Sequence, residues 1–127
     1  MDDDLRVLTV RQPWAWAIVH GGKDVENRSR ATRHRGPLLI HAGQALEHDA
    51  YGVVARLATR LPPAPDQLER GAIIGVVDVV GCVEDSDSPW ADEGLWHWLL
   101  ANPRAIDPPV PAVGKLGLWK PPPGTWP

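Results

Sequence analysis

The stretch GAIIGVVDVVGCV, residues 71–83, is the strongest strand signal in the chain. It consists mostly of β-branched and small apolar residues, and Asp78 is the one charged residue that interrupts it. A short apolar run of this kind predicts a buried strand. Residues 6–11 (RVLTVR) and 37–42 (PLLIHA) are predicted to be further strands. The chain is therefore expected to be built around a sheet.

Helices are predicted between these strands. Pro13 fits the first turn of a helix over residues 13–20, and Gly21 and Gly22 suit its end. Apolar residues at helical spacing predict two more helices, over 46–61 and 91–101. The other expected elements are an exposed strand at 24–29, a basic loop at 29–36, a loop beginning at 62–65, and short strands at 104–106 and 116–119. This order predicts an α+β fold, a small, mixed, partly closed β-barrel with two to three flanking helices.

The length and composition are those of one domain. Residues 1–127 are expected to form it, with flexible ends at about 1–4 and 121–127. No apolar run approaches the roughly 18 residues of a membrane-spanning helix, and the acidic N-terminus does not resemble a signal peptide. Cys82 is the only cysteine, which excludes an internal disulfide and suits a reducing compartment. A cytoplasmic monomer is expected.

The charge of the chain is unevenly distributed. The net charge of −3 argues against a nucleic-acid partner. Residues 5–36, however, hold seven Lys and Arg against two Asp and Glu, a local charge of +5, and the remainder carries −8. Such asymmetry is a better guide to partners than the total. Two interpretations remain open on charge alone, a basic binding face and ordinary solvated arginine-rich loops.

The first motif with chemical potential is Arg11-Gln12-Pro13-Trp14-Ala15-Trp16, at a strand-to-helix junction. A helix N-terminus offers unpaired N–H groups that favour phosphate or carboxylate. Trp14 and Trp16 point about 200° apart on a helix, so both cannot enter one core. We expect one to be buried, and the other either stacks on a planar ligand or covers a neighbouring loop.

The second motif is Gly22-Lys23-Asp24-Val25-Glu26-Asn27-Arg28. On a strand, Glu26 and Arg28 share one face. A carboxylate between Lys23 and Arg28 is held ionised, and it either orients these two cations or accepts a ligand proton. A salt-bridged exposed strand produces the same pattern, so the spacing alone leaves both interpretations open.

Two polar residues interrupt the apolar strands, His41 after residues 38–40 and Asp78 within 73–83. Either Asp78 faces a polar cleft or it is buried with a hydrogen-bonding partner. No metal site is expected, because the five histidines show neither HExxH nor HxH spacing. No cofactor is expected either, because the chain has no GxGxxG or Walker loop.

Taken in order, the motifs resemble the ASCH domain family. The resemblance rests on residues 8–15 (LTVRQPWA), 22–28 (GKDVENR), 35–42 (RGPLLIHA) and 114–119 (GKLGLW), the last being similar to the closing strand of stand-alone bacterial members. It implies a PUA-like β-barrel that binds RNA or single-stranded nucleic acid in a cleft between the barrel and the first helix. The positions expected to bind the nucleic acid, or a nucleoside-like ligand, are Arg11, Gln12, Pro13, Trp14, Trp16, Lys23, Glu26, Asn27, Arg28, Arg35 and His41.

The resemblance also implies an alternative, because some family members are hydrolases of N4-acetylcytidine or ribonucleases. The amidohydrolase pattern has a Lys, a Thr three residues later and a Glu on a central strand. Here Lys23 matches the Lys, Glu26 stands in the Thr position, and Asp78 falls where the Glu would be. The missing hydroxyl removes the nucleophile, although Lys23 with two carboxylates retains the means to activate water. A pocket for a small anionic ligand or a protein partner is the third hypothesis.

Overall fold

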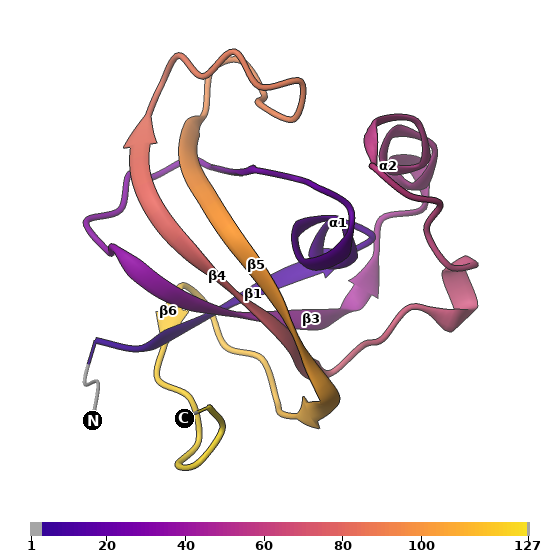
Figure 1. Cartoon of the computed structure of the whole chain (residues 1–127), viewed down its shortest axis with the longest axis vertical. Coiled ribbons are helices and arrows are strands. Elements are labelled where there is room, and N and C mark those ends of the chain that lie inside the picture. The colour runs from indigo at the N-terminus through magenta and orange to yellow at the C-terminus, as the bar shows by residue number, and fades with distance from the viewer. Residues whose placement is uncertain (1–3, 127) are drawn as a thin grey trace.

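Six strands form one mixed sheet in the computed structural model, which describes residues 4–126. The order across the sheet is β2-β5-β4-β3-β1-β6. Strands β1 and β3 are parallel, and all other neighbours are antiparallel. The sheet curls strongly without closing (Figure 1). The strands are β1 (Arg6–Gln12), β2 (Val25–Arg28), β3 (Gly36–Leu46), β4 (Ala72–Val83), β5 (Trp96–Pro111) and β6 (Leu118–Trp119).

The α+β prediction is confirmed, and the curled sheet is consistent with a PUA-like fold. The apolar run that predicted a buried strand is β4, which lies between β3 and β5. Its residues 72–77 and 79 are buried on both faces. One face packs against the first helix, and the other packs against Val7, Leu39 and Trp119. Burial on both faces explains why β4 shows an apolar run, broken only by Asp78, rather than an alternation.

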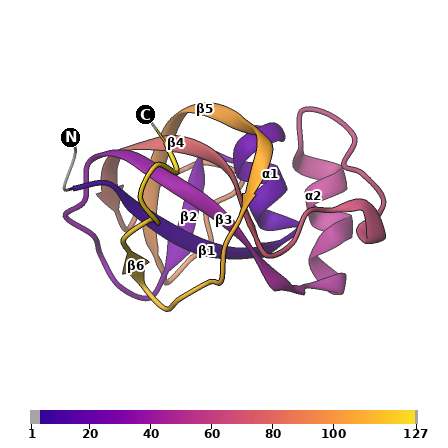
Figure 2. The same cartoon turned by 90° about the horizontal axis from the view of Figure 1, so that it is seen from below.

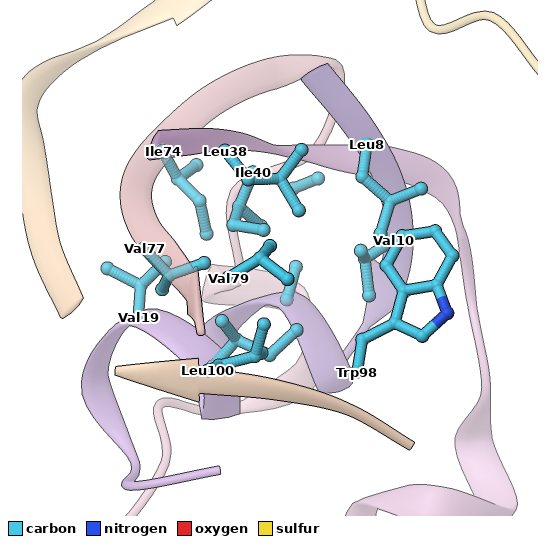
Figure 3. Packing of buried hydrophobic residues seen from close by; sticks show 13 residues of the cluster. Leu8, Val10, Val19, Leu38, Ile40, Ile74, Val77, Val79, Trp98 and Leu100 are labelled. Carbon is cyan, nitrogen blue, oxygen red and sulfur yellow. The ribbon is translucent and has the colours of Figure 1, made fainter. Parts of the chain in front are cut away.

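Helix α1 (Trp14–His20) fills the concave side of the sheet. Its residues Ala15, Ile18 and Val19 pack against apolar side chains of β1, β3, β4 and β5. Figure 3 shows Val19 of α1 among the apolar side chains of the sheet, near Val77. The close approach depends on Gly75 in β4, because a Cβ there would lie 2.7 Å from both methyl carbons of Val19 and 2.8 Å from the carbonyl oxygen of Arg104.

Gly75→Ala is therefore expected to destabilise the protein. The added methyl overpacks the contact between α1 and β4, which costs about 1–3 kcal/mol and lowers the Tm by several degrees. The matched control is Gly52→Ala, because a Cβ at Gly52 meets nothing within 4 Å. Gly52 lies in a helix, so its replacement is expected to stabilise the protein by about 0.5–1 kcal/mol. Equal Tm values for the two variants would contradict the packing described here.

The helix predicted over residues 91–101 is wrong. Strand β5 begins at Trp96 and continues to Pro111, so the strand predicted at 104–106 lies inside a much longer one. Trp98 and Leu100 alternate into the core that α1 covers. Strand β5 pairs with β4 over most of the length of β4. Long-range pairing overrides the helical spacing of Leu95, Trp98 and Leu99. The last strand is also shorter than predicted, because β6 covers only Leu118–Trp119.

The helix predicted over 46–61 is only partly correct. Leu46 ends β3, a 3₁₀ turn covers His48–Ala50, and α2 covers Tyr51–Leu57. Helix α2 lies beside α1, away from the sheet (Figure 2), and its Val54 packs in a cluster with Trp16 and Val25. A second 3₁₀ turn, Pro65–Gln67, lies in the connection to β4.

The predicted chain ends overlap only partly with the described residues. Residues 1–3 and 127 lie outside them. Within 121–126, the ring of Trp126 lies 5.7 Å from the guanidinium carbon of Arg104 and packs beside the cluster of Val7, Leu39 and Trp119. Trp126 thus has a defined contact in a segment whose sequence predicts a flexible end.

Candidate nucleic-acid interface

A cleft of about 590 Å³ opens where the sheet fails to close. Strand β6 pairs only with Val7 and Leu8, and beyond them the edge of β1 faces β2. The Arg28 guanidinium spans this gap and donates to the Thr9 carbonyl oxygen at 3.1 Å. The volume is in the usual range for a small-molecule site. The cleft is lined by Thr9, Val10, Arg11, Trp14, Lys23, Glu26, Asn27, Arg28, Ser29, Glu47, Val53, Leu57, Pro89, Trp90, Asp92, Leu95, Lys115, Leu116 and Gly117.

Glu26 lies between two cations at the inner end of the cleft. Its Oε1 is 3.4 Å from the Lys23 ammonium, and its Oε2 accepts a hydrogen bond from Arg28 Nε at 2.8 Å. The Lys23 and Glu26 side chains are only 3% and 8% exposed. The pairing expected from the sequence is present, and the exposed-strand interpretation is wrong because both side chains are buried. A buried pair of this kind is tolerated because each charge has a partner.

The end of α1 determines where Lys23 lies. The helix ends at His20, and Gly22 takes a φ of +81°, a backbone conformation that glycine adopts without strain. The Lys23 N–H then donates back to the Ala17 carbonyl at 3.0 Å. From this position the Lys23 ammonium donates to the Val25 carbonyl and lies 5.6 Å from the centroid of the Trp14 ring. The glycine pair predicted to end the helix also directs Lys23 into the cleft.

Trp14 and Trp16 point in different directions, as expected. Trp16 is buried in the cluster between α1 and α2. Trp14 is half-buried and lines the cleft, and its indole N–H donates to Glu47 Oε2 at 3.0 Å. The other oxygen of Glu47 is 3.6 Å from the exposed guanidinium of Arg11. Trp14 is thus the tryptophan of this pair that a ligand in the cleft can reach.

Gln12 and Pro13 do not line the cleft. Gln12 is buried, its Oε1 accepts from the Trp16 N–H at 2.9 Å, and its Nε2 donates to the Glu69 carbonyl at 2.8 Å. Pro13 is buried as well, and its carbonyl accepts from the Ala17 N–H at 3.1 Å. The helix N-terminus that the sequence suggested as an anion site is therefore partly occupied by the protein's own side chain.

Asn27 and Arg35 have different positions. Asn27 holds the β4–β5 connection against β2, because its Nδ2 donates to the Trp90 carbonyl and its Oδ1 accepts from the Asp92 N–H, each at 2.9 Å. Arg35 is exposed in the basic loop between β2 and β3, where its guanidinium donates to the carbonyls of Thr32 and His34. Arg35 does not line the cleft, although the same loop begins there with Ser29.

Asp78 lies apart from Lys23 and Glu26 and does not line the cleft. Its two oxygens accept hydrogen bonds from Asn102 at 3.0 Å and from Arg104 at 3.2 Å. The bond from Asn102, together with the bond and charge of Arg104, holds the pKa of Asp78 below its ordinary value, against a smaller effect of burial. The structure thus gives Asp78 the partners that a structural carboxylate requires.

Asp78→Asn is expected to change the pH dependence of stability. A lowered folded-state pKa means that ionised Asp78 stabilises the fold above the unfolded value of about 3.9, and this contribution is lost as the pH falls through the folded value. The Tm difference between wild type and variant should be largest near neutral pH and shrink below about pH 4. Thermal unfolding between about pH 2.5 and 7 measures it. A difference that does not shrink at low pH would contradict this role.

His41 also lies outside the cleft, beneath a neighbouring cavity. It is buried, its Nε2 lies 2.7 Å from the Ala112 carbonyl oxygen, and its ring meets Trp119 edge-on with centroids 5.6 Å apart.

Of the positions predicted to bind, the structure therefore brings six into the cleft. These six are Arg11, Trp14, Lys23, Glu26, Asn27 and Arg28.

Several cleft residues were missed by the sequence reasoning. Trp90 and Asp92 come from the acidic connection between β4 and β5, which folds back over β2, and Glu47 follows β3. Lys115 and Leu116 belong to the motif at 114–119, which the resemblance treated only as a strand.

The cleft is consequently less basic than residues 5–36 suggested. Four of its lining residues are Lys or Arg and three are Asp or Glu.

Residues 4–126 contain neither a metal-binding cluster nor a membrane-spanning helix. No three His, Cys, Asp or Glu side chains in this part of the chain gather closely enough to hold a metal ion. No helix in the same range is long and apolar enough to cross a membrane.

A curled mixed sheet with a helix in its concave side and a charged cleft at the open edge defines a small α+β domain of PUA-like fold. The ASCH domain family matches residues 8–110, and the chain belongs to this family. The family is associated with RNA binding.

Two longer proteins are similar to the chain. Activating signal cointegrator 1 of Homo sapiens is 32% identical over 132 residues, and activating signal cointegrator 1 of Mus musculus is 26% identical over 125 residues. Each match covers 89% of this chain and 22% of the relative, so the chain spans about a fifth of the length of these proteins.

Proposed function

We propose that the protein binds single-stranded RNA by receiving one unpaired base in the cleft. The observation that carries the proposal is the half-buried Trp14, which lines the cleft beside the buried charges of Lys23 and Glu26 and the partly exposed Arg28. Proteins recognise single-stranded RNA by stacking unpaired bases on aromatic rings and by bonding their polar edges. Trp14 supplies such a ring, and the neighbouring side chains and backbone supply polar groups.

The nearly balanced charges of the cleft suit a neutral base better than a phosphate. Glu47 and Asp92 line the cleft together with Glu26, and these carboxylates repel an anion. Their oxygens have more lone pairs than the bonds from Lys23, Arg28 and Trp14 use, so they can also accept from the N–H groups on the edge of a base. A phosphate is better placed on the exposed arginines of the adjoining loop, namely Arg30, Arg33 and Arg35.

The salt dependence of binding tests this arrangement. Three phosphate contacts on a single strand predict a slope of log affinity against log salt of about −2, so the affinity falls about 20-fold between 50 and 200 mM salt. Arg33→Ala is expected to reduce this slope by about 0.7. The control is Arg56→Ala, an exposed arginine on α2 outside the cleft lining and the basic loop. Failure of wild-type protein to bind single-stranded RNA at low salt would overturn the proposal.

The hydrolase alternative uses the same buried pair but has less support. Both Glu26 oxygens are already engaged by Lys23 and Arg28, and Asp78 is engaged by Asn102 and Arg104. A carboxylate that serves as a base needs a free oxygen near the reacting water. We therefore expect purified protein to leave N4-acetylcytidine and short RNA unchanged over hours. Turnover that is lost in Lys23→Ala would favour the hydrolase instead.

A further inference from the structure

A second cavity, of about 770 Å³, adjoins the cleft. It lies between strands β1 and β3 on one side and residues 112–116, the segment after β5, on the other. The two cavities share Thr9, Lys115 and Leu116, so they adjoin each other at these residues. The second cavity is lined by Thr9, His41, Gly43, Gln44, Gly71, Pro111, Ala112, Val113, Gly114, Lys115 and Leu116.

His41 brings an unused polar atom to this cavity. Its Nε2 lies against the Ala112 carbonyl oxygen, which can only accept, so we assign the ring proton to Nε2. In the neutral ring, Nδ1 is then a hydrogen-bond acceptor. This atom is buried and has no hydrogen-bond partner among the described residues. Buried acceptors without a donor are rare because they cost free energy, and one on a residue that lines a cavity is suited to a ligand donor.

The backbone of the segment after β5 lies close to the His41 ring, so a side chain at Gly114 would be crowded. A Cβ at Gly114 would lie 3.2 Å from Nδ1 and 3.0 Å from Cε1 of His41. The same segment carries two of the most exposed large apolar side chains of the described chain, Val113 at 85% and Leu116 at 99%. Exposed apolar side chains beside a cavity are typical of a surface that contacts a ligand or partner.

We propose that the second cavity receives the nucleotide adjoining the one bound in the cleft, and that Nδ1 of His41 accepts a hydrogen bond from it. The donor is either a ribose hydroxyl or a base amino group. This inference rests on the proposed function. Of the residues that line the second cavity, Lys115 is the charged one, and it also lines the cleft, so it is placed to contact the phosphate that links the two nucleotides. The otherwise uncharged, glycine-rich walls suit a flat base.

Binding of mononucleotides and dinucleotides tests the proposal. Wild-type protein should bind a ribodinucleotide at least tenfold more tightly than either mononucleotide. His41→Gln retains an N–H that can reach Ala112 but lacks an acceptor at the Nδ1 position. We expect it to weaken dinucleotide binding about three- to tenfold, the usual worth of one hydrogen bond, and to leave mononucleotide binding unchanged.

Two arms identify the donor. The first arm uses a deoxyribodinucleotide. If wild-type protein binds it as weakly as the His41→Gln variant binds the ribodinucleotide, the donor is the ribose hydroxyl. A loss that follows replacement of adenine or cytosine by uracil assigns the base amino group. Leu116→Ala provides a second variant, expected to weaken dinucleotide binding. Its matched control is Leu61→Ala, because Leu61 is 83% exposed and lines neither cavity.

Equal affinities for mononucleotides and dinucleotides would overturn this inference and leave the proposed function standing. An effect of His41→Gln on mononucleotides as large as that on dinucleotides would overturn it as well, and so would identical affinities of the Leu116 and Leu61 variants. Absence of binding to any of these ligands and to longer RNA would overturn the proposed function, and this inference with it.

Discussion

Glu26→Ala is expected to destabilise the protein by about 3–5 kcal/mol, the usual cost of removing one partner from a buried ion pair. Glu26 is the carboxylate that contacts both Lys23 and Arg28, and the Lys23 side chain is 3% exposed. Without Glu26, the Lys23 ammonium stays buried near the Arg28 guanidinium with no counter-charge. Equilibrium urea unfolding of the variant against wild type measures the loss.

The double variant Lys23→Met/Glu26→Leu is the control for this result. Replacing both charges by apolar residues of similar size removes the uncompensated cation, so the double variant should unfold at a higher urea concentration than Glu26→Ala. It should still bind RNA more weakly than wild type, because the polar inner end of the cleft is lost. A Glu26→Ala variant as stable as wild type would show that the pair does not contribute to the fold.

Trp14→Ala is expected to weaken RNA binding by about 1–3 kcal/mol, or roughly 5- to 150-fold, because that is the usual contribution of one stacked base. Trp14→Phe separates stacking from the hydrogen bond. It keeps an aromatic face but loses the indole N–H that donates to Glu47. The Phe variant should therefore retain most of the affinity. Fluorescence anisotropy with a labelled single-stranded RNA measures all three proteins.

A change of fold must be separated from a change of binding in this series. Circular dichroism and Tm values identify any variant that has lost structure. If folded Trp14→Ala binds RNA as tightly as wild type, Trp14 does not stack on a base, and the proposed position of the base in the cleft is wrong.

Helix α1 and strand β4 could be predicted because their signals are local. Pro13 and the glycines at 21 and 22 mark the two ends of α1, and the β-branched residues of β4 identify it as a buried strand. Strand β5 could not be predicted in the same way. Trp98 and Leu99 fit either a helix or a strand by spacing, and pairing with β4 decides between them. That pairing joins residues far apart in the chain.

The candidate site shows the same division. Glu26 and Arg28 are two residues apart on one strand, so their contact could be predicted from strand geometry, whereas Lys23 reaches Glu26 through the turn at Gly22. Trp90 and Lys115 reach the cleft from distant segments, and no local pattern marks them. Gln12 shows the opposite case. Its motif suggested a ligand, but its side chain binds the protein's own backbone at Trp16 and Glu69.

Binding of a base in the cleft can be observed directly by NMR titration of the ¹⁵N-labelled full chain with a short single-stranded RNA. We expect the indole N–H resonance of Trp14 and the backbone amides of residues 23–28 to shift most, in proportion to bound RNA. The indole resonance of Trp126, which lies beside Arg104 rather than in the cleft, should stay in place. Shifts confined to Trp126 and the residues around Asp78, with Trp14 unaffected, would contradict binding in the cleft.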